Sequence, residues 1–164
     1  MLLRFFRHLL WPLWRLRGKF PPEALRDLES RLAASERKHR GQIRFVIESG
    51  WAWRDLGKTV RERAKELFAL EGVWDTRERC GILFYISFAD RALEIVADRG
   101  IAAVTPVDTW EKICRVAAED FRRDAYTDGL SAALQSLDEV LLRHFPEIAG
   151  SPDENELPDQ VLLR

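Results

Sequence analysis

Acidic and basic side chains lie on both sides of a predicted buried hairpin, in the stretch from Trp74 to Ile101. Asp75 precedes the first apolar strand, and Asp98 and Arg99 follow the second. Carboxylate oxygens are the ligands that calcium and magnesium prefer in proteins, and a guanidinium can bind two oxygens of a phosphate at once. The pattern predicts a divalent-cation site at Asp75 and Asp98, with Arg99 binding phosphate. The alternative is structural: Asp75 caps a turn, and Asp98 pairs with Arg99.

A second candidate site is predicted at the opposite end of the same sheet. Glu48 ends the first predicted strand, and Asp90 follows the second. These two strands are expected to run parallel, so both carboxylates emerge at one edge. Because ligands of open α/β sheets bind at the carboxyl ends of parallel strands, Glu48 and Asp90 form the alternative sheet-end site.

Other catalytic patterns are missing from the sequence, which contains no HExxH, no phosphate-binding glycine loop and no GxSxG motif. Cys80 and Cys114 form no zinc motif. No histidine is predicted beside Cys80, so a buried thiol is favoured over a nucleophile. Trp51 and Trp53 flank the end of the first strand, where they form either a partner-binding patch or a roof over the core.

The elements that position these residues follow from apolar periodicity and punctuation. Residues 81–88 form an apolar run almost without interruption, which predicts a central strand covered on both faces. Residues 92–98 alternate and are expected nearer an edge. Thr59 and Glu62 have the spacing of a capping box at the start of a helix. The predicted helices cover about 22–40, 59–71, 105–121 and 127–145, and the predicted strands 42–49, 81–88 and 92–98, with a short extended piece at 101–104.

This order, helix-strand-helix-strand-strand-helix-helix, predicts an α/β fold. The strand-helix-strand unit gives a parallel pair through a right-handed crossover, and the tight corner at residues 89–91 gives an antiparallel pair. Helices then pack on both faces, which makes a three-layer α/β/α sandwich with a small mixed central sheet. We expect three parts: a basic leader at 1–20, the α/β domain at 21–146 and an acidic tail at 147–164.

The leader is basic and amphipathic, although the whole chain of 164 residues has a formal net charge of only -1. That balance argues against a nucleic-acid partner. On a helix of about 100° per residue, one arc of the leader is mainly cationic and the other consists of Leu and Phe. Such a helix is typical of binding in a membrane interface, with basic side chains drawn to anionic lipid. The residues expected at the membrane surface are Arg4, Arg7, Trp11, Trp14 and Arg15.

The same leader is too short and too charged to span a bilayer. It also shows no cleavage site of a signal peptide, so we expect membrane association on the cytoplasmic side. The alternative is that the leader docks its apolar face on the domain or on a second subunit.

Several segments together resemble the TPM-domain family, also called TPM phosphatase, over about residues 22–159. The resemblance is closest to a compact bacterial subgroup with an Asn-Glu-Leu-Pro-Asp segment near its end. Where the family usually has Asn-Asn-Gly before the central strand, this chain has Arg79-Cys80-Gly81, which removes oxygen ligands. The segments that carry the resemblance are 41–46, 63–68, 73–76, 81–83, 89–91, 94–101, 124–129 and 155–159.

The resemblance implies a three-layer α/β/α domain, with weak phosphatase activity and divalent-cation binding in some members and a protein-assembly or membrane-associated role in others. Our leading expectation is a membrane-associated module that acts through protein partners and binds calcium or magnesium. The alternative is a weak, divalent-cation-dependent phosphomonoesterase of the acid phosphatase type that uses Asp75, Asp98 and Arg99.

Overall fold

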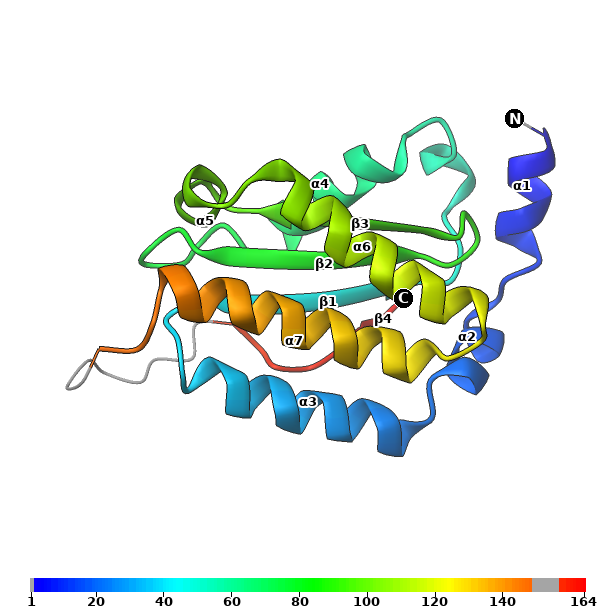
Figure 1. Ribbon diagram of the computed structural model, residues 1–164. Helices are drawn as coiled ribbons and strands as arrows, with labels where there is room; N and C mark the ends of the chain where they lie inside the picture. Colours follow the sequence, from blue (N-terminus) through cyan, green and yellow to red (C-terminus); the bar gives the residue numbers. More distant parts are fainter. Residues whose placement is uncertain (1, 149–156) are drawn as a thin grey trace.

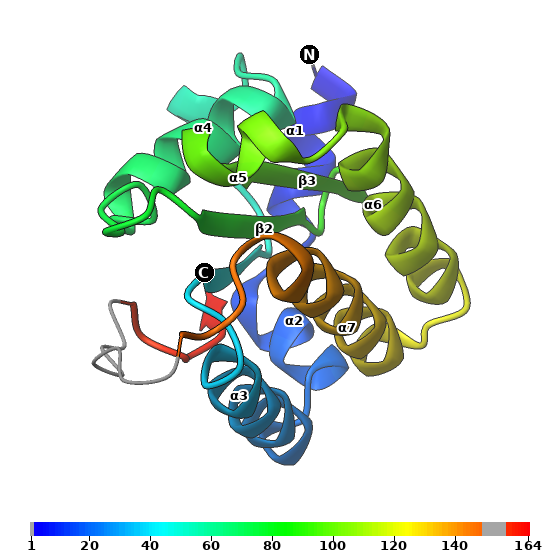
Figure 2. The same cartoon turned by 60° about the vertical axis from the view of Figure 1, so that its left-hand side comes forward.

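A computed structural model describes residues 2–148 and 157–164, and these residues form one mixed sheet between two layers of helices (Figures 1 and 2). The strand order is β3-β2-β1-β4. The predicted parallel pairing of β1 with β2 and antiparallel pairing of β2 with β3 are confirmed. The strands are β1 (Gln42–Glu48), β2 (Gly81–Ser87), β3 (Ala92–Ala97) and β4 (Leu162–Leu163).

The helices cover both faces of the sheet, as the predicted α/β/α sandwich requires. Three long helices, α3, α6 and α7, lie on one face, and α4 lies on the other together with the short 3₁₀ helix η1 (Figure 2). The helices are α1 (Leu2–Leu9), α2 (Leu13–Lys19), α3 (Pro22–Glu36), η1 (Trp53–Asp55), α4 (Val60–Leu70), α5 (Arg99–Val104), α6 (Val107–Arg122) and α7 (Tyr126–His144).

Alternation along the strands divides the core into two clusters. Phe45 and Phe84 point to the face under α3, α6 and α7, whereas Val46 and Tyr85 point to the face under α4. All seven residues of β2 are buried, which confirms its predicted central place. All seven residues of β1 are buried as well, although its sequence predicts only one well-buried face. The reason is that the second face is covered too: Val46 packs in the smaller core cluster with Leu67 of α4, and Arg63 of the same helix binds Glu48.

Two segments differ from their prediction. The extended piece predicted at residues 101–104 is wrong, because these residues belong to helix α5. Asp98 is the N-cap of α5, and its side chain accepts a hydrogen bond from the Arg99 amide at 2.7 Å. The predicted acidic tail ends in a strand, β4, which no local pattern in so short a segment indicates.

The leader packs on the domain. Leu16 of α2 is fully buried, and Phe20 is 2 % exposed. Both belong to the larger core cluster, so the boundary expected after residue 20 divides side chains that pack together. In Figure 1, α1 and α2 lie at the end of the sheet where β2 turns into β3. Among the described helices, none has the length and hydropathy needed to cross a bilayer.

Candidate functional site

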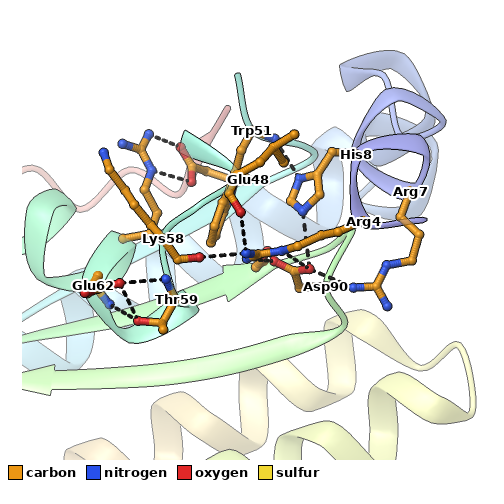
Figure 3. Close-up of polar contacts among 12 residues, drawn as sticks. Arg4, Arg7, His8, Glu48, Trp51, Lys58, Thr59, Glu62 and Asp90 are labelled. Carbon is orange, nitrogen blue, oxygen red and sulfur yellow. Dashed lines mark hydrogen bonds and ion pairs between the residues drawn. The ribbon is translucent and has the colours of Figure 1, made fainter. Parts of the chain in front are cut away.

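The carboxylate of Asp90, at the corner between β2 and β3, binds three side chains of helix α1 (Figure 3). Its side chain is only 6 % exposed. Arg4 donates to both of its oxygens, at 3.1 and 2.7 Å. Arg7 donates to Oδ1 at 2.8 Å, and the Nε2 atom of His8 lies 3.3 Å from the same oxygen. A buried carboxylate needs such partners, since an uncompensated buried charge is costly.

Arg4 also holds the loop that follows β1. Its Nη1 donates to the carbonyl oxygens of Leu56 and Lys58, at 2.8 and 2.7 Å. Its guanidinium lies 4.6 Å from the centroid of the Trp51 ring, a cation–π contact. One side chain therefore joins α1 to the β2–β3 corner and to the loop after β1.

His8 completes this contact as a neutral ring. Its Nδ1 accepts a hydrogen bond from the Trp51 amide at 2.9 Å, so the proton of the neutral ring lies on Nε2, facing Asp90. Burial lowers the pKa of His8, against the opposing effect of the Asp90 charge. Burial also raises the pKa of Asp90, but the hydrogen bond from Arg4 and the neighbouring cations outweigh it, so this pKa lies below its ordinary value.

Glu48 lies at the same end of the sheet in a second buried network. Arg63 of α4 donates to both of its oxygens, at 2.9 and 2.5 Å, and the hydroxyl of Tyr85 donates to Oε2 at 2.7 Å. The Trp51 indole in turn donates to the Tyr85 hydroxyl at 2.8 Å. Burial, with the nearby Glu48 charge, raises the pKa of Tyr85. The alternative sheet-end pair, Glu48 and Asp90, is thus bound by cations of the chain itself.

At the opposite end of the sheet, the structure brings the start of α5 against the loop before β2, as the topology predicts. The Gly100 amide donates to the carbonyl of Arg79 at 2.8 Å. Asp98 is 8 % exposed, and its Oδ2 has no hydrogen-bond partner. Asp75 and Arg99 are exposed. Across the described residues, no group of three His, Cys, Asp or Glu side chains gathers closely enough to hold a metal ion.

The remaining sequence candidates have structural surroundings. Cys80 is fully buried, and its thiol donates to the carbonyl of Arg40 at 3.1 Å. Trp51 is buried over the smaller core cluster, whereas Trp53 is 79 % exposed. Trp51 therefore roofs the core, whereas Trp53 lies at the surface, where a partner-binding patch stays a prediction.

A Ser-His-Asp group was not predicted. Ser35 and His39 lie one turn apart at the end of α3, and the Ser35 hydroxyl lies 3.0 Å from His39 Nε2 and donates to Asp138 of α7. Asp138 is also 3.0 Å from the same ring nitrogen. A catalytic relay needs the aspartate on the other nitrogen, which here faces the carbonyl of Gly41. Ser35 is 3 % exposed, so this group joins helices and carries no accessible nucleophile.

The fold and its charge pairs define a class of protein: a small mixed sheet between helices, with the acidic corner of the sheet closed by an N-terminal helix. The chain belongs to the TPM-domain family, whose model matches residues 17–140. It is similar to BA42 from the psychrophilic bacterium Bizionia argentinensis, whose NMR structure matches with a TM-score of 0.77 at 22 % sequence identity. The match covers 88 % of this chain and 95 % of the BA42 chain. That likeness shows the fold. No curated protein matches the chain.

Proposed function

We propose that this protein is a peripheral membrane module that inserts the outer face of α1 into a lipid interface and presents its TPM domain to protein partners. The observation that carries the proposal is the orientation of α1. An amphipathic helix on a soluble domain usually buries its apolar side. This helix instead turns its polar arc inward to Asp90, which leaves its apolar arc outward.

The outward residues are large and form a continuous stretch. Leu3 is 79 % exposed, Phe6 50 %, Leu9 65 % and Leu10 61 %. In the next helix, Trp14 is 72 % exposed. Full burial of one such side chain contributes about 1.5–3 kcal/mol, so partial insertion of several supports reversible binding. Exposed apolar patches of this kind mark protein or membrane interaction sites.

The basic residues of the leader divide between two roles. Arg4 is held inside by Asp90, and Arg7, 50 % exposed, is bound to it as well. Trp11 packs against Phe88, with ring centroids 4.7 Å apart. Of the expected membrane-surface set, Arg7, Trp14 and Arg15 have exposed positions, but Arg7 is bound to Asp90. We therefore assign the lipid contact to the apolar arc of α1 with Trp14, and the attraction to anionic lipid to Arg15 and its exposed neighbours.

Flotation with liposomes tests this proposal. Phe6→Glu/Leu9→Glu places two charges on the outward arc without touching the Asp90 contact, and should lower the membrane-bound fraction at least about tenfold. Leu70→Glu/Val107→Glu is the matched control, since these residues are 70 % and 73 % exposed on α4 and α6. Substitution is preferable to removal of the leader, which would take Leu16 out of the core. Recovery of the wild-type protein in the lipid-free fractions, or equal loss in both variants, would refute the proposal.

The second candidate function, divalent-cation-dependent phosphomonoester hydrolysis, is favoured by one observation: the unpartnered Oδ2 of buried Asp98. Together with Asp75 in the loop before β2 and Arg99, the next residue in the chain, this oxygen would serve as a ligand for calcium or magnesium. Calorimetry with either cation, and turnover of an aryl phosphate with and without chelator, test it. Asp98→Asn should abolish both if Asp98 is a ligand. It should change stability by only about 1 kcal/mol if the side chain is simply a helix cap.

A further inference from the structure

A pocket of about 520 Å³ opens at the same end of the molecule as α1. Its walls come from α2, the β2–β3 corner, the end of α6 and the start of α7, which meet at this end of the molecule in Figure 1. Its volume lies within the range of small-molecule sites, about 300–1,000 Å³. It meets the Asp90 network at Ser87, whose hydroxyl donates to Asp90 Oδ2 at 3.3 Å.

The pocket is cationic. Lys19, Arg91 and Arg122 line it together with one acid, Asp124. Asp124 is already compensated: Lys19 lies 3.2 Å from its Oδ1, and the Tyr126 hydroxyl donates to the same oxygen at 2.7 Å. Arg91 and Arg122 form no ion pair within 4 Å and no side-chain hydrogen bond among the described residues, although the Arg91 charge also helps to lower the pKa of Asp124. Two guanidinium groups therefore remain available for an anion, and their planar donor geometry fits phosphate.

Arg91 occupies its position at a conformational cost. Its φ is 53°, in the left-handed region where glycine is unstrained and other residues lose about 1–2 kcal/mol. A glycine would make the same turn after Asp90 more easily. Such strain is retained most often where a side chain has a function, and here the strained residue lines the pocket.

The other wall is aromatic. Trp11 packs edge-on against Phe88 with ring centroids 4.7 Å apart, Phe88 lies 5.2 Å from Tyr126, and Tyr126 lies 5.3 Å from Phe121. All four rings line the pocket. A ligand that satisfies both walls has an anionic head beside the two arginines and an apolar body beside the rings.

From this arrangement we infer that the pocket binds the phosphate head group of an anionic phospholipid, with Arg91 and Arg122 as its cationic partners and Trp11 against its glycerol and acyl base. The inference rests on the proposed membrane function, because Trp11 belongs to the leader, follows α1 in the chain and lines the pocket. Basic pockets between transmembrane helices bind anionic lipid head groups, and the two arginines here offer the same chemistry beside an interfacial helix.

Vesicle binding of the full chain gives the first test. Vesicles of phosphatidylcholine with about one fifth phosphatidylglycerol should bind the wild-type protein about tenfold better than pure phosphatidylcholine. Arg91→Gln/Arg122→Gln should lose that preference and keep the weaker binding to phosphatidylcholine. Arg115→Gln/Arg123→Gln removes the same charge from exposed positions of α6 and its end, outside the pocket, and should keep most of the preference. Equal loss in both double variants would show surface charge alone and overturn the inference.

A soluble probe separates this inference from the proposed function. Short-chain phosphatidylglycerol below its micelle concentration, titrated by NMR, should shift the Trp11 indole and the Arg91 and Arg122 amides in the wild-type protein but not in Arg91→Gln/Arg122→Gln. This result supports the pocket even if the full chain fails to float with vesicles. Absence of those shifts, or inorganic phosphate binding as tightly as the lipid, overturns it.

Discussion

Asp90→Asn is expected to release helix α1 from the domain while the sheet stays folded. Asparagine keeps the shape of the side chain but removes the charge that Arg4, Arg7 and His8 share. Its amide would place a donor against guanidinium groups that are themselves donors. Breaking a buried ion pair by removing one partner costs about 3–5 kcal/mol. Most of that loss weakens the docking of α1, because Arg4, Arg7 and His8 all belong to this helix.

Limited proteolysis with trypsin measures the release directly, since Arg4 and Arg7 are cleavage sites within α1. We expect cleavage at these residues to accelerate more than about tenfold in Asp90→Asn. Asp27→Asn is the control: its pair with Arg31 is exposed, at 57 % and 59 %, and such pairs are worth at most about 1 kcal/mol. Unchanged cleavage in Asp90→Asn, or equal acceleration in both variants, would show that Asp90 does not hold the helix.

The same contact makes α1 sensitive to acid. The lowered pKa of His8 means that the docked form favours the neutral ring, so its contribution is fully present above the ordinary pKa of 6.5 and is lost as pH falls through the lower, docked value. Protonation places a hydrogen on Nδ1, facing the Trp51 amide that now donates to it. The lowered pKa of Asp90 acts in the same direction at still lower pH, below its ordinary value of 3.8.

The contribution of Glu36 to stability changes with pH in the opposite direction to that of His8. The pH dependence of global unfolding therefore does not report the docking of α1. Burial raises the pKa of Glu36 to about 9, which stabilises the fold most at acid pH and progressively less as pH rises. Hydrogen exchange in residues 3–9 isolates the local effect. Protection should fall between about pH 7.5 and 5.5, and His8→Gln should flatten this dependence.

Local sequence patterns are sufficient to predict most of the fold. The apolar run at 81–88 predicts a central strand, and the Thr59–Glu62 capping box is present with both of its hydrogen bonds. The corner at 89–91 and the pairing of the three longer strands also follow from the sequence. These features depend on residues close together in the chain or on handedness rules that hold for most folds.

What the sequence could not predict depends on partners far apart in the chain. Helical periodicity separates the two arcs of α1, but it does not say which arc faces the domain. That choice follows from Asp90, whose buried charge is compensated by Arg4 from 86 positions away. The pocket likewise joins Arg91 to Arg122 and to Trp11, three residues that no local pattern relates to one another.

The largest loss of global stability is expected from Glu48→Gln. Glu48 is 4 % exposed and joins β1 to α4 through two hydrogen bonds from Arg63, and to β2 through the Tyr85 hydroxyl. Glutamine of the same length removes the buried partner of the Arg63 charge, leaves it only the half-exposed Glu66 at 3.2 Å, and turns one acceptor into a donor. We expect the free energy of unfolding to fall by about 3–5 kcal/mol, which lowers Tm by about 10 °C in a chain of this size.

Glu94→Gln separates burial from charge in this prediction. Glu94 pairs with Arg61 of the same helix, α4, at 3.0 Å, but the two side chains are 30 % and 50 % exposed. Both variants remove one carboxylate from a guanidinium on α4, so they differ mainly in solvent access. Because water screens the exposed pair, Glu94→Gln should cost less than about 1 kcal/mol. Chemical denaturation measures both. Losses of equal size would mean that the Glu48 network stabilises the fold no more than a surface pair, and that packing of β1 alone holds α4 to the sheet.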